Sequence, residues 1–277
     1  EKTQLETALN DYEKSIQRRY DLTLEQLHWR RWAIKNKCGG DLNKFKQEYP
    51  ITIEEAFAAS SRSVISKEII EEQRKFIREP VQELDGVLYY AHMKSDHYYS
   101  LGADTAEGVG QDDSALTVID RMTGREVASF ASNQIPPDIF AKKIKQVAEY
   151  FNNALVVLEI NNHGLAVLNE LSRLGYMYIF RQRNFDKVTN EWTRKLGWKT
   201  TAVTKPLMVD EFIRALREEE VGLSTAATVG QMLTFVHTDE SNRHRMGAES
   251  GQRDDRLISA MLAWQGFKDL PAEFMEW

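Results

Sequence analysis

Apolar positions in the first part of the chain recur at the three-to-four-residue spacing that predicts amphipathic helices. A capping-box pattern, in which Ser or Thr is followed three residues later by Glu or Gln, begins two of these stretches, at Thr23 and at Thr52. A third helix is expected from Ser66 onward. Because no strand-rich segment lies among these helices, we expect residues 1–92 to form a helical arm or linker region.

The pattern changes near residue 98, where short apolar and β-branched segments replace the helical spacing. The expected elements are strands over 98–103, 114–119, 126–130, 154–160 and 176–180, with helices over 137–151 and 164–174. A hairpin around 186–192 and helices over 206–219 and 254–267 complete the chain. The order β-β-β-α-β-α-β is typical of a mixed sheet with helices on its faces, so we expect an α/β domain over 93–277.

Composition narrows the class of protein. Of the 277 residues 42% are hydrophobic and 28% charged, which excludes a disordered chain, and the single cysteine excludes both a disulfide scaffold and a cysteine-cluster zinc site. No apolar run approaches the roughly 20 residues that cross a bilayer, so no membrane partner is expected. The chain starts with Glu1 and not Met, and we expect it to be a piece of a longer protein.

The formal net charge of -6 gives no indication of a nucleic-acid partner, but the distribution of charge does. The stretch from residue 181 to residue 217 contains nine basic residues and only four acidic ones. A solvated surface would account for this stretch equally well on sequence alone. The alternative is a track for phosphate groups.

Acidic residues stand at three structurally significant places. Asp104 ends the first strand of the sheet, Glu159 lies near the end of its most apolar strand, and the pair Asp254-Asp255 opens the last helix. A carboxylate beside apolar residues is costly to desolvate unless a cation or hydrogen-bond donors compensate it. Taken singly, Asp104 could be a turn residue and either member of the pair a helix N-cap. Together they would form the oxygen-rich cluster that Mg²⁺ or Mn²⁺ prefers, with room for two ions.

Four segments resemble the nuclease domain of the large terminase subunit of tailed bacteriophages. They are LGADTAEGVGQDDSALTVID at 101–120, VVLEINNHG at 156–164, LGWKTTAVTKPLMVDEF at 196–212 and GAESGQRDDRLISAMLAW at 247–264. The segments LTLEQLHWRRWAI at 22–34 and FKQEYPITIEEAFAAS at 45–60 resemble the part that leads out of that family's ATPase domain. The resemblance covers nearly the whole chain.

The resemblance implies an RNase H-like fold and an Mg²⁺- or Mn²⁺-dependent endonuclease that cuts concatemeric phage DNA during packaging. It implies catalytic and metal-binding roles for Asp104, Glu159 and Asp255, with Asp254 as a second ligand or an N-cap. The family often has histidine before the aspartate pair, where this chain has Arg253. The nearby histidines, at 163 and 244, are interpreted as ordinary loop residues.

The resemblance also implies partners. A complete large subunit carries a P-loop ATPase, but the sequence contains no G-x-x-x-x-G-K-[ST] motif and no ATP site is expected in this chain. The implied partners are double-stranded DNA, the ATPase domain of the same subunit, the small terminase subunit and the portal, in the host cytoplasm.

On this interpretation the basic stretch contacts DNA phosphates. The candidate DNA-binding residues are Arg181, Arg183, Arg194, Lys195, Lys199 and Lys205. The glycine-containing turn at 108–113 carries two acids and no lysine, so it is interpreted as a hairpin loop and not a phosphate loop. The alternatives are another RNase H-like nuclease, such as a Holliday-junction resolvase or a transposase, and a non-catalytic module that docks on DNA or the portal.

Overall fold

The computed structural model describes residues 9–51, 62–106, 112–161, 163–186, 190–239 and 245–268. The chain divides into two compact units, residues 1–61 and 62–277. This division comes earlier than the boundary near residue 92 that the sequence suggests. The reason is that residues 62–92 contain a helix and two strands that join the fold of the second unit.

The first unit contains the helices α2 (Asp11–Tyr20), α3 (Leu24–Asn36) and α4 (Leu42–Glu48). The expected capping box is present at the start of α3, where the backbone N–H of Gln26 donates to Thr23 Oγ1 at 3.2 Å and the Thr23 N–H donates to Gln26 Oε1 at 2.8 Å. Two small apolar clusters hold these helices together. The second expected capping box, at Thr52, lies outside the described residues.

The second unit is built on a six-stranded sheet with the order β1-β2-β5-β4-β3-β6. Its strands are β1 (Gln82–Leu84), β2 (Val87–Tyr89), β3 (Tyr99–Asp104), β4 (Ser114–Asp120), β5 (Arg125–Ser132) and β6 (Leu155–Leu158). The pairs are antiparallel except for β3 and β6, which run parallel. The predicted meander of three strands and the predicted mixed sheet are therefore confirmed.

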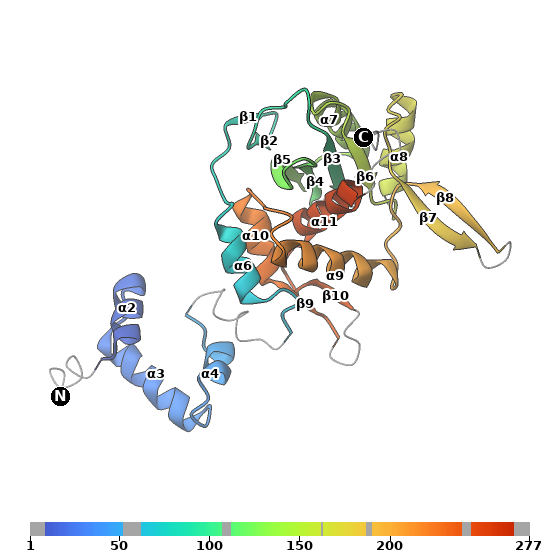
Figure 1. Ribbon diagram of the computed structural model, residues 1–277. Coiled ribbons are helices and arrows are strands. Elements are labelled where there is room, and N and C mark those ends of the chain that lie inside the picture. The colour runs from blue at the N-terminus through green and yellow to red at the C-terminus, as the bar shows by residue number, and fades with distance from the viewer. Residues whose placement is uncertain are drawn as a thin grey trace. The chain divides into compact units, whose positions relative to one another are not determined.

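Helices cover both faces of this sheet, which gives an α/β domain of three layers (Figure 1). One apolar core joins the sheet to α7 (Pro137–Tyr150) and α8 (Gly164–Arg173). A second core on the opposite face is formed with α6 (Lys67–Arg74), α9 (Thr204–Arg217), α10 (Ala226–Leu233) and α11 (Asp255–Lys268). Successive side chains along each strand point alternately into the two cores, as the period-two geometry of a strand requires.

Small and polar side chains on β3 and β4 let α11 approach the sheet closely. Ser100 Oγ donates to the carbonyl oxygen of Ala263 at 2.7 Å, and the hydroxyls of Thr117 and Ser259 lie 2.8 Å apart. A Cβ added at Gly102 would lie 2.0 Å from the backbone oxygen of Ser259. The position of α11 across β3 is therefore set by backbone-to-backbone contact.

The remaining strands form two separate two-stranded sheets. The hairpin of β7 (Arg181–Asp186) and β8 (Glu191–Leu196) was expected, and it projects from the body of the second unit (Figure 1). Strands β9 (Phe235–His237) and β10 (Met246–Ala248) were not expected, and neither was α10. The predicted strand over 176–180 is reduced to an isolated parallel bridge between Ile179 and Val156.

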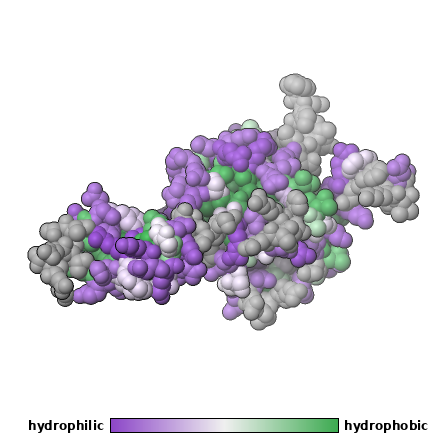
Figure 2. Space-filling model, turned by 90° about the horizontal axis from the view of Figure 1, so that it is seen from below, coloured by the Kyte–Doolittle hydropathy of each residue, from purple (hydrophilic) through white to green (hydrophobic). Residues whose placement is uncertain are grey.

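Hydrophilic residues predominate on the face seen in Figure 2, where hydrophobic residues show only in small patches. Among the described helices none is long and apolar enough to cross a membrane.

Candidate active site

Two carboxylates stand at neighbouring strand ends, on the side of the sheet that α11 covers. Asp104 is the last residue of β3, and Glu159 follows directly after β6, the strand parallel to it. Because Gly102 contacts α11 and side chains alternate along β3, Asp104 also points toward α11. On β6, Val157 belongs to the core on the α11 side, so Glu159 shares that side. The sheet geometry thus brings the two acids together.

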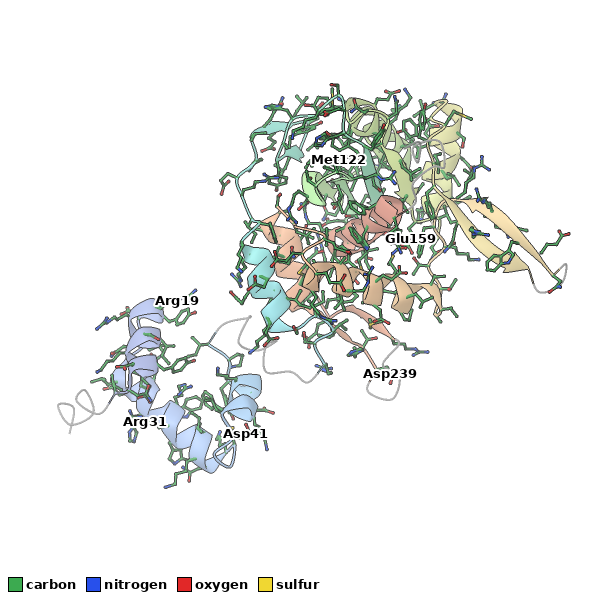
Figure 3. All side chains as sticks on the ribbon, viewed as in Figure 1. Arg19, Arg31, Asp41, Met122, Glu159 and Asp239 are labelled. Carbon is green, nitrogen blue, oxygen red and sulfur yellow. The ribbon has the colours of Figure 1, made fainter. Side chains whose placement is uncertain are left out.

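Glu159 is held by backbone contacts on both sides. Its N–H donates to the carbonyl oxygen of Ala103 at 3.0 Å, which continues the β3–β6 ladder by one residue. A Cβ added at Gly164 would lie 1.8 Å from the Glu159 backbone oxygen, so α8 begins directly against this residue. In Figure 3 Glu159 lies between α11 and the base of the β7–β8 hairpin.

The beginning of α11 adds two more carboxylates. Asp255 is 7% exposed, and its Oδ2 accepts a hydrogen bond from the Asp113 N–H at 3.0 Å. Asp254 Oδ2 accepts from the N–H of Ala248 in β10 at 3.2 Å and lies 3.9 Å from Lys205 Nζ. Both aspartates therefore keep their carboxylates on defined partners at one end of the sheet.

Electrostatics couple these acids to one another. Burial raises the pKa of Asp104 well above its ordinary value, and the charge of Glu159 and a hydrogen bond between the two carboxyls act in the same direction. The charges of Asp255 and Asp254 raise the pKa of Asp104 further. Burial also raises the pKa of Asp255 to about 6, against the lowering effect of the hydrogen bond from Asp113. The Asp104 carboxyl is therefore affected by the charge of each of the other three acids.

The donor set fits a hard divalent cation, although it is not preassembled. Among the described residues no three His, Cys, Asp or Glu side chains form a group that could hold a metal ion in this arrangement. Burial and the neighbouring acids make the charged form of Asp104 unfavourable when no cation is present. A divalent cation would compensate these charges and satisfy several carboxylate oxygens at once.

Two residues near the acids, Asp113 in the acidic turn and Arg253 before the aspartate pair, have no role among the predicted ligands. Asp113 lies in the acidic turn that we expected to be a hairpin loop. Its carboxylate accepts a hydrogen bond from Arg253 Nη1 at 2.7 Å. Arg253, which stands where the resembling family often has histidine, thus fixes the segment whose N–H contacts Asp255. Their signal in the sequence was only proximity to motifs. Of the two nearby histidines, His163 precedes α8 as an exposed residue and His244 lies outside the described residues.

The candidate DNA-binding residues fall into two groups. In the β7–β8 hairpin Arg183 pairs with Arg194, and strand alternation places Arg181 on the same face of the ribbon, whereas Lys195 lies on the other face. The Arg183 guanidinium stands 5.3 Å from the ring centre of Trp192, which is 64% exposed. Like charges directly opposite each other destabilise a ribbon in isolation, so this face is suited to an anionic partner.

The base of this ribbon adjoins Glu159. Beyond β8, Trp198 N–H donates to the Leu158 carbonyl at 2.7 Å and the Trp198 carbonyl accepts from the Ile160 N–H at 2.9 Å. Lys199 follows as an exposed residue. Lys205 belongs to the second group, because it lies beside Asp254 and not on the ribbon. Backbone hydrogen bonds therefore join the base of the ribbon to the segment that contains Glu159.

Comparisons with known proteins agree with this fold. No family model and no curated protein matches the sequence. The large terminase nuclease from thermophilic phage G20c, in a crystal structure with bound magnesium, has a TM-score of 0.58 and 19% identity, covering 74% of this chain and 98% of that one. The large terminase nuclease domain of Thermus phage P74-26 has a TM-score of 0.55 and 21% identity, covering 71% of this chain and 93% of that one.

The fold therefore belongs to the RNase H-like class of mixed sheets with helices on both faces. Within that class it is the fold of the large terminase nuclease domain of phages. The resemblance that the sequence motifs indicate is confirmed at the level of the fold.

Proposed function

We propose that this chain is a divalent-metal-dependent DNA endonuclease that cuts concatemeric viral DNA during genome packaging. The observation that carries the proposal is the placement of Asp104 and Glu159 at adjacent strand ends, facing the two aspartates that begin α11. The solved phage nucleases with the same fold include crystal structures with bound magnesium, cobalt and zinc, which supports a divalent cation as the partner of these acids.

Asp104, Glu159 and Asp255 are the proposed ligands, and Asp254 the fourth. Two bound Mg²⁺ or Mn²⁺ ions would supply a water activated for attack and stabilise the leaving oxygen of the phosphodiester. The protein's own contribution is to hold the acids on the sheet and on α11, whose mutual position is fixed by close contact at Gly102. Lys205 partly neutralises Asp254 when no cation is present.

The ribbon face with Arg181, Arg183 and Arg194 is proposed to contact the DNA backbone. Arginine binds phosphate oxygens through its planar fork, and these contacts fix the register of the duplex without reading its sequence. Lys199, an exposed residue that follows Trp198 beyond the ribbon, would carry the contact toward the scissile phosphate. An Arg183→Gln/Arg194→Gln variant should lower DNA affinity and reduce the salt dependence of binding by about two phosphate contacts. Lys142→Gln, an exposed change on α7, is the matched control.

The proposal extends to the assembly in which cleavage occurs. Residues 1–61 would lead out of the ATPase domain of the same subunit, and the small terminase subunit and the portal would be further partners in the host cytoplasm. The separate compactness of residues 1–61 supports a connecting role.

Cleavage of supercoiled plasmid tests the central claim. The chain is incubated at low salt with Mn²⁺, Mg²⁺ or EDTA, beside Asp104→Asn and the control Asp210→Asn, which changes an exposed acid on α9. We expect metal-dependent nicking and linearisation by the wild type and the control, and none by Asp104→Asn. Equal cleavage by Asp104→Asn would refute the site. Metal binding without cleavage would instead favour a DNA-binding or docking module.

A further inference from the structure

The first turn of α11 poses a problem for a metal ligand. The first N–H groups of a helix have no partner within it, and an aspartate at the N-cap normally turns its carboxylate back to accept from them. Asp254 occupies the N-cap position, because its carbonyl oxygen accepts the first helical bond, from Ile258 N–H at 2.8 Å. A carboxylate used for capping would be turned toward the helix and away from a cation.

A residue from another helix performs the capping instead. The N–H of Leu257, the third residue of α11, donates to Gln231 Oε1 at 3.0 Å. The Asp254 carboxylate accepts from Ala248 N–H and faces Lys205. Gln231 thus supplies the oxygen that an N-cap side chain normally supplies, and the Asp254 carboxylate stays on the Ala248 N–H and beside Lys205, turned away from the helix N–H groups.

The position of Gln231 is itself fixed by long-range contacts. The helix that carries it, α10, begins where Ser224 N–H and Thr225 N–H donate to the buried carboxylate of Glu126 at 2.6 and 2.9 Å. On either side of Gln231, Val229 and Met232 are buried in the core shared with α11. Gln231 is therefore presented to α11 by a packed element and not by a loop.

We propose that Gln231 is a positioning residue for the cation site, which caps α11 in place of Asp254 and thereby keeps the Asp254 carboxylate available as a ligand. The inference rests on the proposed function, since it needs a divalent cation at these acids. Groups that orient metal ligands typically change metal affinity 10- to 100-fold when they are removed. Without Gln231, Asp254 is the nearest replacement cap, and its carboxylate would turn to the Leu257 N–H.

The test is Mn²⁺ affinity, measured by titration calorimetry on the full chain. Gln231→Met keeps the size of the side chain but removes the acceptor, and Gln231→Glu keeps an acceptor oxygen. We expect about a tenfold loss of affinity in Gln231→Met and little or no loss in Gln231→Glu. Gln231→Ser, which cannot reach Leu257, is a second acceptor-free variant with the same expected loss in case the methionine variant does not fold.

A double-mutant comparison separates positioning from simple helix capping. Asp254→Asn should weaken Mn²⁺ binding in the wild-type background and have almost no further effect in Gln231→Met, because the carboxylate has already left the site. If Gln231 only stabilises α11, Gln231→Met will unfold at a lower temperature, while Mn²⁺ affinity and the effect of Asp254→Asn stay unchanged. That result would overturn the inference and leave the proposed nuclease intact. Absence of Mn²⁺ binding by the wild type would instead refute both.

Discussion

Replacing Asp255 by Asn should stabilise the metal-free protein at neutral pH, although it removes a proposed ligand. Burial and neighbouring acids raise the pKa of Asp255 from 3.8 to about 6 in the folded chain. A carboxyl with a raised folded-state pKa contributes stability that is complete below pH 4 and lost as the pH rises through 6. The difference between a pKa of 3.8 in the unfolded chain and about 6 in the folded chain corresponds to at most about 3 kcal/mol at pH 8.

The assay is urea unfolding in EDTA at pH 4.5, 6 and 8, followed by tryptophan fluorescence. We expect the unfolding free energy of Asp255→Asn to exceed that of the wild type by up to about 3 kcal/mol at pH 8 and by about 1 kcal/mol at pH 4.5. Its side-chain oxygen can still accept from Asp113 N–H, so that contact is preserved. Asp210→Asn, an exposed change on α9, should show no such pH-dependent gain. A gain that is independent of pH, or a loss at pH 8, would refute the reasoning.

Three further outcomes follow from the same geometry. Millimolar Mn²⁺ should raise the melting temperature of the wild type and not that of Asp255→Asn. The stability advantage of Asp255→Asn should therefore shrink or reverse when the metal is present. Gly102→Ala should lower the unfolding free energy by about 3 kcal/mol, because its Cβ would lie 2.0 Å from the backbone oxygen of Ser259. Gly230→Ala is the control in the same thermal melt. It has open space in α10 and should be neutral or stabilising. Lys205→Gln should raise Mn²⁺ affinity about threefold by calorimetry, because the ammonium competes for Asp254; a fall would show that Lys205 instead assists binding.

Elements with strong local signals were predictable from the sequence. Alternation and helical spacing predicted the β3–β5 meander, the strand that ends just before Glu159, the hairpin and the helix that begins at Asp255. The failures were short elements whose stability comes from distant partners. Strand β1 has only three residues, all exposed, and α10 depends on Glu126, about a hundred residues earlier in the chain. No local window contains those partners.

The candidate site divides in the same way. The sequence placed Asp104 and Glu159 at the ends of two strands. The parallel pairing of β3 with β6 brings these two strand ends next to each other. Whether Asp254 faces a cation or caps α11 could not be decided locally, because aspartate suits both roles. The answer depends on Gln231, which is 26 residues away from the N–H that it accepts.

The sequence by itself determined which residue types were available at each strand end and helix start, because local periodicity and capping preferences act over a few residues. Only the tertiary structure decided which carboxylates lie on the same side of the sheet and which lysine or backbone N–H each one contacts. It also decided which face of the ribbon carries the arginines. Those outcomes depend on the pairing of β3 with β6 and on the contact of α11 with Gly102, where backbone approach leaves no room for a side chain. Charges and hydrogen bonds act over a few ångströms in space, whatever the separation along the chain.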